Sequence, residues 1–408
     1  MQKLHPKFIM VSNYINHHQI PFCNVMYQLL GGDFAFCQTE EVEQERVNMG
    51  WAAGHELPYL MMYQENPQEC QKQIDNCQVV FFGGTDEESY IQCRLQNKKT
   101  VIRYSERIYK SGQWKAVSPR GLKKKYMDHT RYRKEPVYML CSGAYVPSDF
   151  QIIKAYPGKM LKWGYFPETK RYDVDKLLEE KESATILWAA RMIDWKHPDQ
   201  PVRVAKYLKD KGRTFAMNVI GGGELEPSVR QLAEKLGVTA EVNFLGYRKP
   251  EEVRLYMEKA DIYLVTSDRQ EGWGAVVNEA MNSGCAVVAS HMIGAAPYLI
   301  THGRDGLFYK DGDVNGLCRA VESLLSDREK CQQLGRNAYA TITELWNPEN
   351  AALQLAGFCL RQGFLEEKDL PGIENVDLAG LQAIPAKGPC SIAPVISERK
   401  MYSTLVEK

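Results

Sequence analysis

Residues 262–290 read IYLVTSDRQEGWGAVVNEAMNSGCAVVAS. A β-branched apolar run (Ile262–Thr266) enters a glycine-containing loop, which leads into good helix formers and then into a second apolar run (Ala286–Ser290). This order is typical of a βαβ unit in a parallel sheet. Open parallel sheets bind ligands where their strands end, so the loop 267–274 is a candidate binding site.

The same alternation of short apolar runs and amphipathic stretches extends along most of the chain. The strands expected are Lys7–Asn13, Phe34–Thr39, Val79–Gly83, Thr100–Tyr104, Val137–Cys141, Thr185–Ala189, Phe215–Ile220, Val242–Leu245, Ile262–Thr266 and Ala286–Ser290. Helical patterns lie between them, for example at Pro227–Leu236 and Pro250–Lys259. A chain of 408 residues is too long for one ordinary core. The sequence therefore predicts an α/β protein with two doubly wound, Rossmann-like domains.

The domain boundary is expected near a linker-like segment, 164–168. We predict one domain over residues 1–168 and a second over 169–346. Residues 347–408 should form a terminal helix over Glu349–Gln362, capped by Asn347, that crosses back to the first domain and ends in a tail. The periodicity of the last residues is too weak to assign them a structure or a role.

The composition excludes several classes of protein. Lys plus Arg and Asp plus Glu both number 51, so no global field attracts nucleic acid or membrane. No apolar run of ~18 residues could span a bilayer, and the N-terminus lacks the apolar region of a signal peptide. The 11 cysteines show no zinc-like spacing, which favours a reducing, cytoplasmic compartment.

Two glutamates in the quoted stretch are candidates for ligand binding. Glu271 lies in the loop and Glu279 follows it in the helix-like segment, which we expect to begin near Gly274. At ~1.5 Å per residue Glu279 would lie ~7–8 Å along that helix, a separation that suits a sugar at one carboxylate and a ribose at the other. The alternative is that both are solvated surface acids.

The segment from about Ala184 to Phe358 resembles the C-terminal domain of glycosyltransferase family 4 in its E-x7-E signature, EGWGAVVNEAM over 271–281. The resemblance implies the GT-B fold, a retaining reaction and a nucleotide-diphosphate sugar as donor. It also implies that Glu271 binds the donor sugar and Glu279 the nucleotide ribose. Gly272, Trp273 and Gly274 belong to the same donor-binding signature.

A second match to that family is the sequence ARMIDWK over 190–196. The resemblance implies that Arg191 and Lys196 hold the donor diphosphate. Fixed cations stabilise the charge that develops on a departing diphosphate, in place of a metal ion. Two surface cations on a turn are the alternative.

Further positions match the family's donor site more loosely. Gly222 and Gly223 correspond to its loop near the phosphates, and Arg248 ends the segment that corresponds to its base-contacting region. The D-x-D string Asp173–Asp175 is better explained as a helix cap than as a metal site. We therefore expect no metal ion and no cofactor besides the donor co-substrate.

The first half of the chain should bind the acceptor and resembles the family less. His17 and His18 follow the first expected strand, where a histidine could contact diphosphate or acceptor or serve as a base near neutral pH. Glu106 follows the strand Thr100–Tyr104, close to where the family places a residue near the reacting sugar. A capped helix start and a solvated loop are the alternatives.

The segment Lys110–Lys134 is strongly basic, with nine Lys and Arg residues against Asp128 alone, and aromatic residues lie between them. An anionic membrane surface or a lipid-diphosphate acceptor suits this pattern in a glycosyltransferase. Nucleic-acid binding and a solvated, mobile face are the alternatives. We expect a membrane partner and no nucleic acid, and hence a protein that is peripheral on the inner face of the membrane.

The expected reaction transfers a hexosyl unit to an acceptor hydroxyl, by resemblance in bacterial polysaccharide or glycolipid biosynthesis. Two other functions stay open at this point. The first is a GT-B sugar-nucleotide 2-epimerase, which would consume donor without an acceptor. The second is a non-catalytic subunit that kept the fold, although the intact acidic and cationic pairs argue against it.

Overall fold

The structure is a computed structural model that describes residues 6–42, 57–373, 380–381 and 383–407. The chain divides into two compact units, each built from two segments. The first unit contains Met1–Glu168 and Trp346–Ile396, and the second contains Thr169–Leu345 and Ser397–Lys408. The expected boundary after residue 168 coincides with this division, but the last residues belong to the second unit instead of forming one tail.

The first unit is built on a seven-stranded parallel sheet of order β3-β2-β1-β4-β5-β6-β7. Its strands are β1 (Phe8–Ser12), β2 (Phe34–Gln38), β3 (Leu60–Met62), β4 (Val79–Phe82), β5 (Val101–Ser105), β6 (Val137–Ser142) and β7 (Met160–Trp163). The helices are α1 (Ile20–Leu30), α3 (Pro67–Asn76), α4 (Ser89–Gln96), α5 (Pro119–Asp128), α6 (Val146–Ile152) and α15 (Pro348–Arg361). The strand order reverses between β1 and β4, which places the loops after these strands at a switch point where α/β sheets bind ligands.

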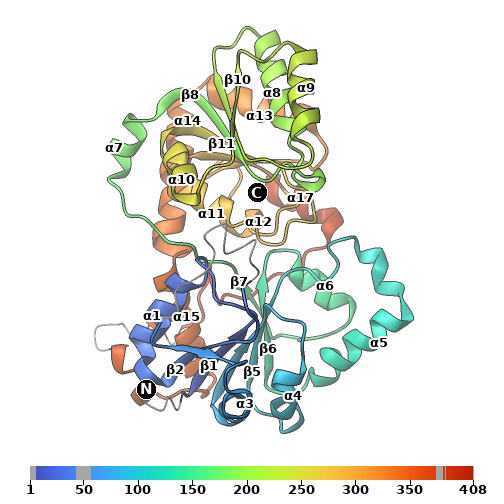
Figure 1. The fold of residues 1–408 in the computed structure, drawn as a ribbon, viewed down its shortest axis with the longest axis vertical. Coiled ribbons are helices and arrows are strands. Elements are labelled where there is room, and N and C mark those ends of the chain that lie inside the picture. The colour runs from blue at the N-terminus through green and yellow to red at the C-terminus, as the bar shows by residue number, and fades with distance from the viewer. Residues whose placement is uncertain (1–5, 43–56, 374–379, 382, 408) are drawn as a thin grey trace. The chain divides into compact units, whose positions relative to one another are not determined.

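The second unit has a six-stranded parallel sheet of order β10-β9-β8-β11-β12-β13 (Figure 1). Its strands are β8 (Glu182–Ala189), β9 (Ala216–Ile220), β10 (Val242–Gly246), β11 (Ala260–Val265), β12 (Ala286–Ser290) and β13 (Leu307–Tyr309). The helices are α7 (Val174–Glu179), α8 (Asp199–Asp210), α9 (Glu226–Leu236), α10 (Pro250–Lys259), α11 (Val276–Asn282), α12 (Ala296–Leu299), α13 (Val314–Leu325), α14 (Arg328–Ala340) and α17 (Glu398–Val406). Here the switch point lies between β8 and β11.

The helix α13 illustrates how these elements are stabilised. Its side chains Leu317, Val321 and Leu324 recur at helical spacing and are buried in the core of the second unit. Asp313 caps the helix by accepting a hydrogen bond from the backbone N–H of Gly316 at 2.8 Å. Apolar residues point inward and polar residues outward, as is usual for a helix on a sheet.

All ten expected strands are present, with bounds that shift by at most three residues. Asn347 caps α15 as expected, because its side chain accepts from the N–H of Asn350 at 2.7 Å. Three strands, β3, β7 and β13, were not expected, since runs of three or four residues are too short to show alternation. The tail is partly ordered: Lys162 of β7 exchanges backbone hydrogen bonds with Cys390 and Ser391.

In the part of the chain that the structure describes, no helix combines the length and the apolar character that a membrane span needs.

Candidate active site

The loops after β8 and β11 meet at one edge of the second unit's sheet. These strands are parallel neighbours, so their carboxyl ends point the same way. Two hydrogen bonds join the loops: the hydroxyl of Thr266 donates to the carbonyl of Lys196 at 2.6 Å, and the N–H of Asp268 donates to the carbonyl of Trp195 at 3.0 Å. The two segments that the sequence singled out for donor binding are therefore in direct contact.

Lys196 and Glu271 form an ion pair at this edge. The ammonium of Lys196 donates to the carboxylate of Glu271 and lies 4.4 Å from the ring centre of Trp195. The two side chains are only 14% and 12% exposed. An ion pair between two largely buried side chains holds both charges within the site. When the pair separates, each charge can interact with a ligand. The site can therefore offer a cation to an anionic group and a carboxylate to hydroxyl groups.

Glu279 lies in the first turn of α11, which begins at Val276. The helix begins two residues after Gly274, where its start was expected, so Glu279 lies closer to the helix N-terminus than the expected separation of ~7–8 Å. Burial raises the pKa of Glu279 to about 7, and nearby Arg254 opposes that rise. The carboxyl group therefore changes its charge close to neutral pH.

The glycines of the signature shape the loop. Gly274 has φ +86°, and a Cβ atom there would lie 2.8 Å from a methyl group of Ile293 and 3.3 Å from Cγ of Glu271. Gly272 is buried, and the indole of Trp273 is buried as well and donates to the side chain of Asn278 at 2.9 Å. Trp273 therefore holds the loop in place from within the protein, which is a positioning role for its side chain.

The glycine loop after β9 packs directly on the loop that carries Arg191. The N–H of Met192 donates to the carbonyl of Gly222 at 2.8 Å, and a Cβ atom on Gly223 would lie 2.6 Å from the carbonyl oxygen of Met192. Only glycine permits this approach. Arg191 itself is exposed and forms no ion pair with a residue that the structure describes, so its guanidinium is available to an anion.

Arg248 lies beyond the end of β10 and donates to the carbonyl of Tyr247 at 2.9 Å. Among the described residues, no hydrogen bond or ion pair connects Arg248 to Lys196 or Glu271. Its expected place near the donor base stays a prediction.

His197 and Asp268 are a neighbouring pair that the sequence analysis did not single out. The imidazole Nε2 lies 3.6 Å from the Asp268 carboxylate, and this interaction raises the pKa of His197. Burial opposes ionisation of Asp268, but the interaction with His197 and the hydrogen bond from the Gln270 N–H lower its pKa overall. No motif marks this pair, and only the left-handed backbone of His197 (φ 50°) distinguishes it.

In the first unit, the loops after β1, β4 and β5 meet around Tyr104. Its hydroxyl lies 2.9 Å from the Ser12 hydroxyl and accepts from the Gln19 amide at 3.2 Å. A Cβ atom on Gly84 would lie 2.2 Å from the Ser12 oxygen, so this turn after β4 requires glycine. The polar side chains of Ser12, Gln19 and Tyr104 therefore converge near the switch point of this sheet, next to the turn after β4.

The three candidate residues of the first unit are brought together by Tyr165. Its hydroxyl donates to Glu106 at 2.7 Å, and its ring stacks with His18 at a centroid distance of 6.4 Å. The rings of His17 and His18 lie 3.8 Å apart, and Lys110 pairs with Glu106 at 2.5 Å. Tyr165 was missed because it falls in the segment interpreted as a linker.

Burial, with a smaller effect of His17, lowers the pKa of His18 to about 3. Its imidazole is therefore neutral at pH 7 and too weakly basic to accept a proton there. The expectation that a histidine suits the role of a base near neutral pH is wrong for His18. A hydrogen-bonding role for His17 and His18 stays a prediction.

The D-x-D string has structural roles. Asp173 caps α7 by accepting from the N–H of Lys176 at 3.2 Å, and Asp175 pairs with Arg336 at 2.6 Å. Within the described ranges, no group of three or more His, Cys, Asp or Glu side chains is arranged to hold a metal ion.

Comparison with known proteins assigns the class. Residues 170–341 match the family model described as Glycosyl transferases group 1. The crystal structure of Anabaena HepE in complex with UDP has a TM-score of 0.65 and is 14% identical, over 86% of this chain and 99% of that one. The fold is that of GT-B glycosyltransferases, and residues 170–341 in the second unit are similar to group 1 glycosyl transferases.

Among curated proteins, the chain is similar to a GDP-mannose-dependent alpha-(1-6)-phosphatidylinositol monomannoside mannosyltransferase of Mycobacterium tuberculosis. The match is 27% identical over 46% of this chain and 50% of that protein. A D-inositol 3-phosphate glycosyltransferase of Corynebacterium urealyticum is 31% identical over 45% of this chain and 40% of its own length. The chain thus spans about half the length, or less, of these relatives.

Proposed function

We propose that the protein is a retaining glycosyltransferase of the family 4 type, which transfers a hexosyl unit from a nucleotide-diphosphate sugar to an acceptor hydroxyl. The observation that carries this proposal is the buried ion pair between Lys196 and Glu271 at the carboxyl edge of β8 and β11. These two residues come from separate loops, and both lie inside the segment that matches the group 1 family. Their contact supports the roles that the sequence resemblance implies.

Donor binding would separate this ion pair. Lys196 would turn to the diphosphate, where the exposed Arg191 adds a second cation, and Glu271 would accept hydrogen bonds from the sugar hydroxyls. When the glycosidic bond breaks, negative charge grows on the departing diphosphate, and both cations stabilise it. These fixed charges would replace a metal ion, so we propose that the reaction is metal-independent.

The remaining donor contacts follow from the same arrangement. Glu279 would bind the ribose hydroxyls, while the backbone at Gly222 and Gly223 approaches the phosphates and the region of Arg248 receives the base. A carboxylate that accepts from two hydroxyl groups is favoured in its ionised form, so donor binding should lower the raised pKa of Glu279.

The first unit would bind the acceptor near His17, His18 and Glu106. Retention is consistent with attack from the face that the diphosphate leaves, with the diphosphate taking the acceptor proton. Because His18 is neutral, it would orient a hydroxyl by hydrogen bonding without removing its proton. The names of the relatives support a lipid or glycan acceptor, and we propose a cytoplasmic enzyme that works at the inner face of the membrane.

A screen of nucleotide sugars tests the proposal. A donor at ~100 times its dissociation constant should stabilise the protein by ~2.7 kcal/mol in a thermal-shift assay. Transfer from that donor should keep the anomeric configuration, as seen by NMR, and should survive excess EDTA. Loss of activity in EDTA that Mg²⁺ restores would contradict metal independence. Release of free nucleotide diphosphate and an epimerised sugar without any acceptor would favour the epimerase instead.

A further inference from the structure

The helix α5 and the turn before it, η2 (Gln113–Val117), expose an unusual number of apolar side chains. No residue of α5 is buried. Leu122, Tyr126 and Met127 are 40%, 55% and 41% exposed, and Trp114 and Val117 before them are 70% and 79% exposed. We call these five side chains the apolar face of η2–α5. An isolated exposed apolar residue is ordinary, whereas five within fourteen positions are an unusual concentration.

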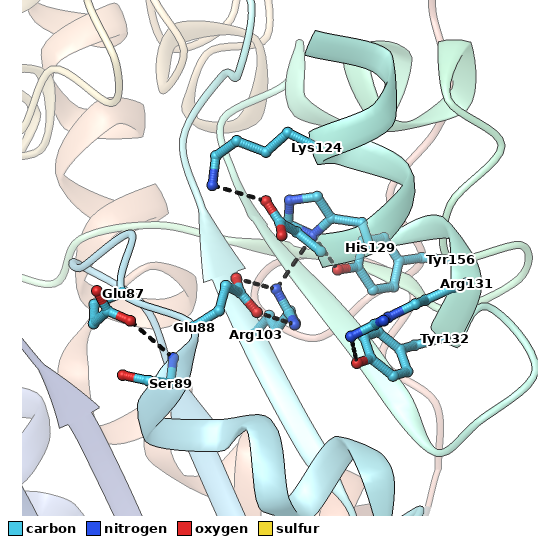
Figure 2. Close-up of polar contacts among 10 residues, drawn as sticks. Glu87, Glu88, Ser89, Arg103, Lys124, His129, Arg131, Tyr132 and Tyr156 are labelled. Atoms are coloured by element: carbon cyan, nitrogen blue, oxygen red, sulfur yellow. Dashed lines mark hydrogen bonds and ion pairs between the residues drawn. The ribbon is translucent and has the colours of Figure 1, made fainter. Parts of the chain in front are cut away.

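The opposite side of α5 is polar and faces the protein. Asp128 is largely buried and pairs with the exposed Lys124 at 3.0 Å, and burial lowers the pKa of Lys125. Figure 2 shows Lys124 extending from α5 on the side where Glu88, Arg103 and His129 lie. The inner contacts of this helix are therefore made by charged groups.

A buried polar network lies beneath the helix. The guanidinium of Arg103 donates two hydrogen bonds of 2.7 Å to Glu88 and approaches His129 at 3.3 Å (Figure 2). The His129 ring nitrogen in turn lies 2.7 Å from the Tyr156 hydroxyl. Burial lowers the pKa of His129, so the ring is neutral beside Arg103. This network lies at the end of α5, because His129 directly follows the last residue of the helix.

The helix α5 is therefore inverted relative to α13. Leu122 and Tyr126 are one turn apart on the outer side, whereas the partly buried side chains of Lys125 and Asp128 lie on the inner side. In α13 the apolar residues point into the core. An inverted helix leaves apolar area in water unless a partner covers it.

Charge complementarity identifies the partner. The segment 110–134 carries nine cationic residues against one Asp, in a chain whose formal net charge is zero. Arg120 and Lys123 lie on or next to the apolar face, are exposed and form no ion pair with a described residue. Aliphatic and aromatic side chains next to free cations suit the boundary between lipid headgroups and acyl chains.

We infer that η2–α5 docks the protein on an anionic lipid bilayer by inserting its apolar face below the headgroups, with Arg120 and Lys123 at the lipid phosphates. Membrane docking does not depend on transferase activity. It rests on the proposed function only for its purpose, which is to bring the enzyme to a lipid-linked acceptor. The inference also changes the roles expected of the lysine run: the exposed Lys123 faces the lipid, whereas the partly buried Lys125 faces the protein.

Sedimentation with vesicles tests this inference on the full chain. We expect binding to phosphatidylcholine vesicles that contain about one third phosphatidylglycerol, and much weaker binding to phosphatidylcholine alone. The triple variant Trp114→Ser/Leu122→Ser/Tyr126→Ser should lower the partition coefficient at least about tenfold, because the buried apolar area is lost. The matched control Tyr247→Ser/Leu255→Ser removes two equally exposed apolar residues of the second unit and should change it less than about twofold.

Two further measurements distinguish insertion from general attraction. Brominated lipids should quench tryptophan fluorescence in the wild type and not in Trp114→Phe. Lys123→Gln should weaken binding more than Lys125→Gln, whereas a purely electrostatic patch would respond equally to both. Equal responses, unchanged binding by the triple variant, or no binding of the wild type to anionic vesicles would each overturn the inference. A wild-type dimer that the triple variant dissociates, without loss of vesicle binding, would instead assign the face to a second copy.

The result of the vesicle experiments can be distinguished from the result of the test of the proposed function. Donor binding by the triple variant in the absence of vesicles should equal that of the wild type, because the substituted side chains are exposed and belong to the first unit. Failure of donor binding in the wild type would reject the transferase and leave the vesicle result standing. Normal donor binding without vesicle binding would reject only the docking surface.

Discussion

The two sheet edges that carry candidate residues differ in how they are built. In the second unit, Lys196 and Glu271 lie on two neighbouring loops and oppose each other as charges. In the first unit, His18 and Glu106 come from loops after different strands and both contact Tyr165, while His18 is held neutral. A site made of charges on two loops leaves a short pattern in the sequence. A site assembled through an intermediate aromatic residue does not.

The difference also separates two kinds of chemistry. The paired charges of the second unit suit a ligand whose own charge changes during reaction. The aromatic and neutral groups of the first unit suit orientation of an uncharged hydroxyl. Substitutions at the two edges should therefore differ in size and in the kinetic constant that they affect.

The largest effect should come from Lys196→Ala. Loss of one electrostatic stabiliser of a developing charge typically costs ~3–4 kcal/mol in the barrier, so kcat should fall by roughly two to three orders of magnitude. Initial rates at saturating donor measure this. The control Lys235→Ala, on the exposed side of α9, should leave kcat unchanged. A loss of less than about threefold would show that this lysine does not stabilise the leaving group.

The two glutamates should differ in calorimetric titrations. Glu279→Gln should weaken both the free nucleotide diphosphate and the intact donor by about 1.5–3 kcal/mol, the range for hydrogen bonds to a charged group. Glu271→Gln should weaken only the intact donor. It should not lower affinity for the free diphosphate, because Lys196 is then released from its ion pair. Equal weakening of the free diphosphate by both variants would contradict the division into sugar and ribose sites.

Glu279 also makes stability depend on pH. Its pKa rises from the usual 4.5 to about 7 on folding, so the folded state binds this proton more tightly than the unfolded state. The free energy of unfolding should therefore fall as pH rises from 4.5 to 7 and stay level above that. At pH 8 Glu279→Gln should be more stable than the wild type by about 3 kcal/mol, and at pH 4 the two should be alike. Urea unfolding at both pH values measures the difference; the same difference at pH 4 and pH 8 would exclude this carboxyl as its cause.

The smallest effect should come from Tyr165→Phe in the first unit. Removing one hydrogen bond to Glu106 costs about 1 kcal/mol, so kcat/KM for the acceptor should fall about fivefold. Donor affinity should not change, since the donor contacts proposed lie in the second unit. Tyr138→Phe, which removes a hydroxyl contact to Gln362 in the same unit, serves as the control. A drop in donor affinity as large as the drop in kcat/KM would contradict the assignment of donor and acceptor to different sheet edges.

Much of the fold follows from the sequence because long apolar runs determine buried strands. The ten expected strands all formed, and the signature loop and the ARMIDWK loop meet because β8 and β11 are parallel neighbours. The sequence did not predict β3, β7 and β13, which are too short to show a period. Tyr165 was missed for another reason: its role depends on where the chain passes after β7, and no local pattern encodes that position.

The orientation of α5 could not be predicted from the sequence either. Apolar and cationic residues at helical spacing define two faces, but spacing alone does not say which face turns inward. The polar pair near the end of α5, Glu88 and Arg103, comes from other elements, and its two residues are fifteen positions apart. The loop position of Glu271 was predicted, but its contact with Lys196 requires two loops that are 75 residues apart in the chain.

The first unit is built from two segments that are far apart in the chain, and this affects how the protein folds during its synthesis on the ribosome. Its seven strands are synthesised before residue 168, whereas α15, which packs against α1, begins only at Pro348. At ~5–20 residues per second, synthesis of Thr169–Leu345 keeps α1 without that cover for roughly 10–35 seconds. The sheet of the second unit can form in this interval, but the first unit cannot be completed until its last segment emerges. A nascent chain that stalls after residue 345 would therefore present the apolar face of α1 to chaperones.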